Sequence, residues 1–158
     1  MKRLHSVLTV VAVLAVGLLV AGCSDTAEKN EYVDTVNEIQ TEMSDALTEA
    51  SSAAAESPKD AADQLDQAAS IVSDALTKLK DVEVPEDAKA GHDDLIAAID
   101  ETRALFSETA SDLRKIGKND VSGLFELQAE LQESINGITP KIDAAIDKIN
   151  KDIGATGA

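Results

Sequence analysis

Residues 58–81, PKDAADQLDQAASIVSDALTKLKD, carry the clearest helical pattern in the chain. Pro58 suits the first turn of a helix, where no backbone donor is needed. The apolar residues recur at intervals of three and four, which places them on one face of a helix. They are Ala61, Leu65, Ala68, Val72, Leu76 and Leu79. The pattern predicts an amphipathic helix whose apolar stripe other helices must cover.

Three further segments repeat this pattern, over about 30–56, 86–116 and 120–153. Pro58, Pro85 and Gly117 lie at the breaks between segments, and each residue type disfavours continuation of a helix there. Gly137 and Pro140 lie inside the last segment, but its apolar phase runs through them. We therefore expect one helix kinked near Gly137–Pro140 rather than two helices.

The same spacing predicts which residues face the core. In the first segment these are Tyr32, Val36, Ile39, Met43, Ala46, Leu47 and Ala50. In the third they are Ala88, Leu95, Ile99, Phe106, Leu113 and Ile116. In the fourth they are Val121, Leu124, Gln128, Leu131, Ile135, Ile138, Ile142, Ile146, Ile149 and Ile153.

Four amphipathic segments joined by short connections predict an all-α fold, an antiparallel four-helix bundle with up-down-up-down topology. A long helical hairpin that dimerises through its stripes is the alternative architecture. Hydrophobic residues make up 44% of the chain and aromatic residues only 2%, which suits helix packing better than an aromatic-lined pocket.

The N-terminal stretch has the layout of a secretory signal. Lys2 and Arg3 precede the uncharged apolar run SVLTVVAVLAVGLLV, residues 6–20, and small residues follow at Ala21 and Gly22. The uncharged window from residue 4 to residue 22 is also marginally long enough to span a bilayer. An uncleaved membrane anchor is therefore the alternative to a cleaved leader.

The sequence LVAGC, Leu19–Cys23, resembles the lipobox of bacterial lipoproteins. The resemblance implies cleavage between Gly22 and Cys23 and attachment of diacylglycerol to the Cys23 thiol. Several acyl chains on one residue would make dissociation from a membrane negligible, at about 0.8 kcal/mol per buried methylene. Together, this resemblance and the helical pattern divide the chain into four parts. These are a leader over 1–22, a lipidated cysteine and polar tether over 23–31, a helical bundle over 32–153 and a flexible tail over 154–158.

Other chemistry at Cys23 has little support in the sequence. It is the only cysteine, so it cannot form an intramolecular disulfide, and no Cys/His cluster for zinc is present. A catalytic thiol needs a neighbouring base, and the uncharged leader offers none.

The residues after position 22 are strongly acidic. Without Lys2 and Arg3 the chain has 12 basic and 30 acidic residues, a net charge of −18. Such a surface repels nucleic acid phosphates and anionic lipid headgroups, so unaided binding to either is not expected.

Candidate catalytic and metal-binding residues are few. His92 is the only histidine beyond the leader; it borders the apolar stripe, and we expect a partly buried or rim position rather than a ligand or base. The Glu-x-x-His pattern of di-iron bundles is missing, because residue 89 is Lys. Acidic side chains recur at helical spacing, and we expect solvated faces partly paired with Lys141, Lys148 and Lys151. They are Asp63, Asp66, Glu126, Glu130, Glu133, Asp143 and Asp147.

These observations predict a non-enzymatic protein without cofactor or metal, lipid-anchored through Cys23 on the extracytoplasmic face of the cell membrane. Its expected role is that of an interaction or structural module contacting another protein of the cell envelope. The alternative function is binding of a small apolar or cationic ligand between helices near the Pro140 kink, close to Phe106, Phe125 and Gly137.

Overall fold

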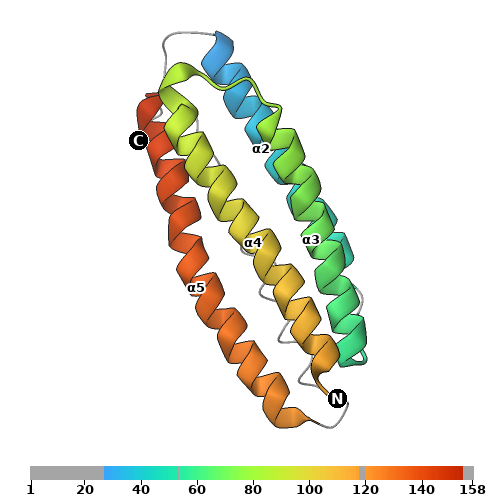
Figure 1. Ribbon diagram of the computed structural model, residues 1–158. Helices are drawn as coiled ribbons and strands as arrows, with labels where there is room; N and C mark the ends of the chain where they lie inside the picture. The colour runs from blue at the N-terminus through green and yellow to red at the C-terminus, as the bar shows by residue number, and fades with distance from the viewer. Residues whose placement is uncertain (1–26, 53, 118–119, 155–158) are drawn as a thin grey trace.

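The computed structural model describes residues 27–52, 54–117 and 120–154 (Figure 1). The predictions for the leader, for Gly22 and Cys23, and for residues 155–158 of the tail lie outside the described residues. The described elements are α2 (Ala27–Ala50), α3 (Pro58–Lys80), the short 3₁₀ helix η2 (Glu86–Ala88), α4 (Lys89–Lys115) and α5 (Val121–Asp152).

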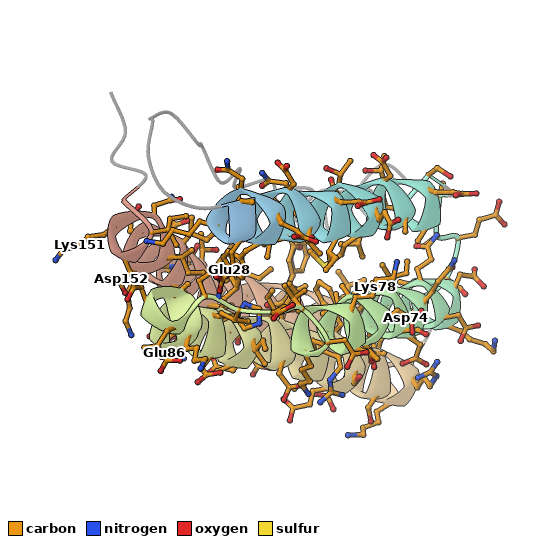
Figure 2. The ribbon with its side chains drawn as sticks, turned by 90° about the horizontal axis from the view of Figure 1, so that it is seen from above. Glu28, Asp74, Lys78, Glu86, Lys151 and Asp152 are labelled. Atoms are coloured by element: carbon orange, nitrogen blue, oxygen red, sulfur yellow. The ribbon has the colours of Figure 1, made fainter. Side chains whose placement is uncertain are left out.

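The four long helices run alternately up and down and form a four-helix bundle, as the sequence predicts, with no strand among the described residues. Backbones pack closely between α3 and α4 and between α4 and α5, and less extensively between α2 and α3. The described parts of α2 and α5 approach each other much less. Figure 2 shows α2 as a separate layer above α3 and α4.

Local sequence explains where the helices begin. Ser57 caps α3, because its Oγ accepts a hydrogen bond from the Asp60 backbone N–H at 3.2 Å. Asp120 caps α5 in the same way, since its Oδ1 accepts from the Gly123 N–H at 2.9 Å. Each cap satisfies one of the backbone donors that a helix leaves unpaired at its N-terminus.

The first helix differs from its prediction at both ends. It begins at Ala27, so residues 27–31, expected in the polar tether, form its first turn. It ends at Ala50 rather than near residue 56. Ser51 marks this end, because its Oγ donates to the Thr48 carbonyl at 3.0 Å, a local bond of the kind that competes with helix continuation.

Helix α5 is continuous through Gly137 and Pro140, so the prediction of one helix rather than two is confirmed. Pro140 has no backbone N–H, so the Asn136 carbonyl lacks its usual helical hydrogen-bond donor. Asn136 and Pro140 are both exposed, and water can donate to this carbonyl instead. Nearby, the Thr139 Oγ1 donates to the Ile135 carbonyl at 2.9 Å.

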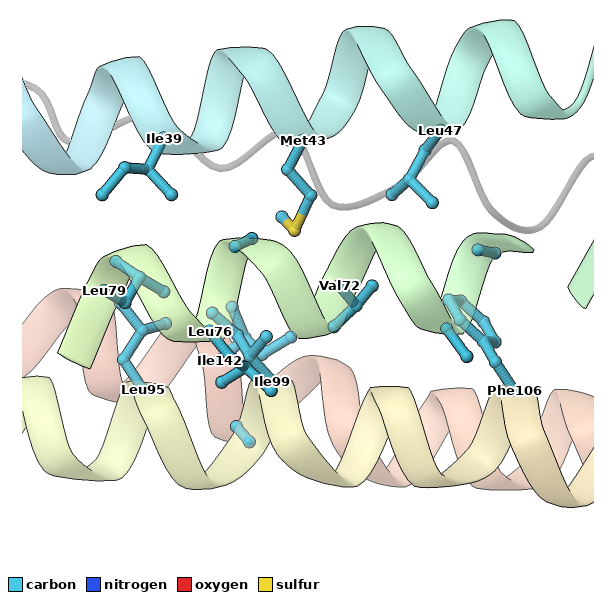
Figure 3. Close-up of a cluster of buried hydrophobic side chains, with 14 of the residues drawn as sticks. Ile39, Met43, Leu47, Val72, Leu76, Leu79, Leu95, Ile99, Phe106 and Ile142 are labelled. Carbon is cyan, nitrogen blue, oxygen red and sulfur yellow. The ribbon is translucent and has the colours of Figure 1, made fainter. Parts of the chain in front are cut away.

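The core lies along the bundle axis. Figure 3 shows α2 side chains pointing toward those of the other helices. The labelled residues are Ile39, Met43, Leu47, Val72, Leu76, Leu79, Leu95, Ile99, Phe106 and Ile142. All six residues predicted for the α3 stripe are buried. The prediction was wrong for Val121, which is 60% exposed. Eight other predicted core residues are only half-buried: Ala46, Ala50, Ile116, Leu124, Gln128, Ile135, Ile138 and Ile153.

Gly91 marks the closest approach of α4 to α5. A Cβ atom added at Gly91 would lie 2.7 Å from Ile149 Cγ1 and 3.0 Å from the Ile149 backbone nitrogen. Ile149 is fully buried at 0% exposure. The two helices can therefore pack at this depth only because residue 91 has no side chain.

Candidate functional site

The most specific polar arrangement in the described core surrounds His92, near the start of α4. The side chain is 4% exposed, so His92 is more deeply buried than the partly buried or rim position expected. Its Nδ1 lies 3.1 Å from the Tyr32 hydroxyl of α2, and its Nε2 lies 3.0 Å from the Leu79 carbonyl of α3. One imidazole therefore joins three helices.

The hydrogen-bond partners decide the tautomer. A carbonyl can only accept, so the Nε2–H donates to Leu79, and the Nδ1 lone pair then accepts from the Tyr32 O–H. The two rings meet edge to face, with centroids 5.7 Å apart. Burial lowers the pKa of His92 below its usual value, although the Leu79 carbonyl and Asp93 oppose this, and burial raises the pKa of Tyr32 to about 12. Both groups are neutral at pH 7.

This arrangement ties three helices of the bundle together. Both ring nitrogens are used in hydrogen bonds within the core, so neither is available to a substrate. Tyr32 belongs to α2, the helix whose backbone packs least closely against the others. The buried bond between Tyr32 and His92 therefore helps to fix α2 against α4.

Stability should depend on pH through His92. The unfolded chain binds a proton near pH 6.5, whereas the folded state binds it only at lower pH, so this contribution is complete above about pH 6.5 and lost as pH falls toward the folded pKa. Protonation would give Nδ1 a hydrogen that faces the Tyr32 hydroxyl, leaving the tyrosine proton without its acceptor. Between pH 7 and pH 5 the wild type should lose on the order of 1 kcal/mol relative to His92→Gln, measured by urea unfolding.

The variant His92→Gln keeps a neutral donor and acceptor but does not titrate in this range. The many carboxylates are the same in both proteins, so their effect cancels in the difference. Parallel stability curves for the two proteins would show that His92 does not carry the pH dependence.

A small apolar cavity lies in the core between all four long helices. Its volume is about 40 Å³. The lining residue nearest to Pro140 in the sequence is Ile142, two positions further along α5. The lining residues are Val36, Ile39, Gln40, Met43, Ala75, Leu79, Leu95, Ile99, Ile142 and Ile146. Small-molecule sites usually enclose about 300–1,000 Å³, and no charged side chain lines this cavity to hold a cation. In this conformation the cavity is a packing gap. Phe106 packs in the core outside its lining, and Phe125 is exposed.

Filling the gap should stabilise the fold. Val36→Ile adds one methylene at the cavity wall, and we expect a gain of about 0.8 kcal/mol in the free energy of unfolding. Val33→Ile is a matched control on the same helix, because Val33 is 1% exposed and does not line the cavity. There the added methylene has no space and should destabilise. The prediction fails if chemical denaturation ranks the two variants in the opposite order.

Salt bridges link neighbouring helices across the surface. The Arg114 guanidinium of α4 donates to Asp63 at 2.9 Å and to Asp66 at 2.5 Å on α3, and these bonds raise the pKa of Arg114. Lys141 and Lys148 of α5 pair with α4, contacting Glu101 at 2.6 Å and Asp94 at 2.7 Å respectively. The structure thereby corrects the expectation that these lysines pair with Asp63, Asp66 or the carboxylates of α5. Exposed pairs of this kind contribute little to stability because solvent screens them, but they help to fix helix register.

The described carboxylates form no convergent cation site. Within residues 27–52, 54–117 and 120–154, no three His, Cys, Asp or Glu side chains gather as metal ligands would. None of the helices in this part of the chain has the length and apolar character needed to cross a bilayer.

No protein-family model, curated protein or solved structure matches the chain. The described residues themselves define the structural class of the protein. It is an acidic four-helix bundle in which a buried histidine joins three helices. Sequence reasoning missed Tyr32 and Leu79 as partners of His92. The sequence did carry a signal: Tyr32 lies on the apolar stripe of one helix and His92 borders the stripe of another. Buried polar side chains require hydrogen-bond partners, so the two could have been expected to pair.

Proposed function

We propose that this protein is a bacterial lipoprotein whose helical domain is held at the extracytoplasmic face of the membrane by acyl chains on Cys23. The observation that carries the proposal is the sequence LVAGC at Leu19–Cys23, which follows a basic and then apolar leader. Helix α2 begins only four residues after Cys23, so the tether would be short and would keep one end of the bundle near the lipid headgroups.

The domain would act by contacting another protein of the envelope rather than by catalysis. Its one buried histidine is engaged within the core, and its cavity of about 40 Å³ is far below the size of an ordinary ligand site. Charged side chains cover the outer faces of the described helices, as Figure 2 shows. These features favour the interaction role over the alternative of ligand binding.

Intact-mass measurement of protein extracted from bacterial membranes tests the anchor. The expected mass is that of a chain beginning at Cys23, without residues 1–22 and with the added mass of a diacylglyceryl group. A mass that includes residues 1–22 and no lipid would support an uncleaved signal anchor and would contradict the proposal.

Crosslinking in intact cells, followed by purification of the full-length protein, tests the interaction role. We expect discrete crosslinked species that contain one envelope protein. Absence of any such species, together with a ligand-dependent rise in melting temperature on a metabolite panel, would favour the ligand-binding alternative.

A further inference from the structure

The chain contains one Asn-Gly pair, Asn136 and Gly137, and both residues are exposed on α5. An asparagine side-chain amide can be attacked by the backbone nitrogen of the residue that follows it. A side chain on that next residue hinders the approach, whereas glycine has none and adopts conformations that other residues avoid. Asn37 and Asn150, in α2 and α5, are followed instead by charged residues with long side chains. Asn136 is therefore the asparagine whose neighbour favours this attack.

The reaction consumes only water. The Gly137 backbone nitrogen bonds to Asn136 Cγ, and the bond between Cγ and the side-chain amide nitrogen breaks. Ammonia leaves with the proton from the Gly137 N–H, and a succinimide ring remains. Water then opens this ring. Opening at Cγ gives aspartate, and opening at the Asn136 main-chain carbonyl gives isoaspartate, whose backbone runs through Cβ and Cγ. The net change is loss of ammonia and gain of a carboxylate.

A closed helix slows this reaction, so the rate depends on local opening. Ring closure requires the Asn136 backbone to leave the helical range of ψ. It also requires the Gly137 N–H, which in an intact helix donates to the Glu133 carbonyl. Segments of a native protein open with very different free energies, and those with few packing contacts open most readily. How firmly α5 is held beside Asn136 therefore sets the rate.

Several features of α5 ease opening at this point. Pro140 has no N–H, so the Asn136 carbonyl already lacks its helical donor. Glycine is a poor helix former, and nothing among the described residues lies within 4 Å of a Cβ added at Gly137, so no neighbour packs on that face. The Asn136 side-chain oxygen accepts a hydrogen bond from the Gln132 amide at 3.2 Å. Both side chains are exposed, so water can replace this bond.

We propose that Asn136 is a site of spontaneous deamidation, in which attack by the Gly137 nitrogen converts the amide to aspartate and isoaspartate. Either product adds a negative charge, and isoaspartate also adds a carbon to the backbone. Regular helical geometry cannot then continue through residue 136. Of the five buried residues of α5, only Leu131 precedes Asn136. Modification would therefore loosen residues 121–135, while residues 142–152 stay packed.

Ageing of the purified full-length protein tests this proposal. The protein is held in mildly alkaline buffer for several weeks, and peptide mapping by mass spectrometry measures deamidation at each asparagine. Chromatography of the same peptides separates aspartate from isoaspartate. Asn37 and Asn150 are internal controls, since both lie in described helices. We expect Asn136 to convert about tenfold faster than either, and hydrogen exchange in the aged protein to rise within residues 121–135.

Two variants separate the Asn-Gly pair from the helix that holds it. Gly137→Ala places a side chain on the attacking residue and favours the helix, so deamidation at Asn136 should slow about tenfold. Pro140→Ala keeps the Asn-Gly pair but restores the donor to the Asn136 carbonyl, so the reaction should again slow several-fold. Both substitutions raise helix propensity at exposed positions, and circular dichroism checks that both variants fold.

Four outcomes would overturn the proposal. The first is no conversion at Asn136 under conditions in which a synthetic peptide of residues 133–141 deamidates, because the folded helix would then protect the site. The second is conversion of Asn37 or Asn150 at the same rate as Asn136. The third is an unchanged rate in Gly137→Ala. The fourth is an unchanged rate in Pro140→Ala, which would contradict local opening beside the proline as the cause of the reactivity.

Discussion

Replacing Cys23 with serine is expected to abolish lipid attachment completely. In cells supplied with a labelled fatty acid, the wild-type protein should carry the label and Cys23→Ser should show only background. The reason is chemical, because the proposed linkage is a thioether and Cys23 is the only thiol in the chain. Without acyl chains the domain loses about 0.8 kcal/mol of membrane binding for each methylene that had been buried.

Ser24→Ala is the matched control, since it removes a side chain of similar size one residue beyond the proposed site. It should incorporate as much label as the wild type. Label that persists in Cys23→Ser would contradict the proposal, and so would a wild-type protein that carries none. The domain after residue 22 has a net charge of −18, so an unacylated domain freed of its leader should also leave anionic membranes and enter the soluble fraction.

The α3 segment shows how far apolar spacing alone predicts this fold. All six stripe residues between Ala61 and Leu79 are buried, because α3 contacts both α2 and α4 and its whole stripe is covered. The pattern in α5 is equally regular, yet Val121 is exposed and Leu124 is half-buried. Periodicity identifies the face that a helix offers, whereas burial also depends on whether a neighbour reaches that part of the helix.

The polar contact in the core shows why the site was only partly predictable. The sequence places His92 beside an apolar stripe, but its two partners lie on other helices, and Tyr32 is 60 positions away. Helix register must be known before the Tyr32 hydroxyl and the Leu79 carbonyl can be assigned to the imidazole. The Lys141 and Lys148 pairs with α4 were missed for the same reason.

Gly91 is a further position whose importance only tertiary packing reveals, and substitution there should have the largest effect on folding. Gly91→Val is expected to reduce the free energy of unfolding by about 3 kcal/mol. Its Cβ would lie 2.7 Å from Ile149 Cγ1, whereas carbon atoms pack favourably at about 3.5–4.0 Å. Because the Ile149 nitrogen is also only 3.0 Å away, rotation of the isoleucine side chain cannot relieve the contact. Helices α4 and α5 must separate instead, and urea unfolding measures the cost.

Gly137→Val is the matched control because it makes the same chemical change within a helix at a glycine with no heavy atom near the added Cβ. Valine has a higher helix propensity than glycine, so this variant should be neutral or slightly more stable than the wild type. The difference in stability between Gly91→Val and Gly137→Val therefore measures the contact between α4 and α5 separately from the effect of helix propensity. Equal stabilities for Gly91→Val and Gly137→Val would mean that α4 and α5 do not approach each other closely at Gly91. A loss confined to Gly91→Val identifies this glycine as the residue that sets the spacing of the two helices, and through α4 the position of His92 beside Tyr32.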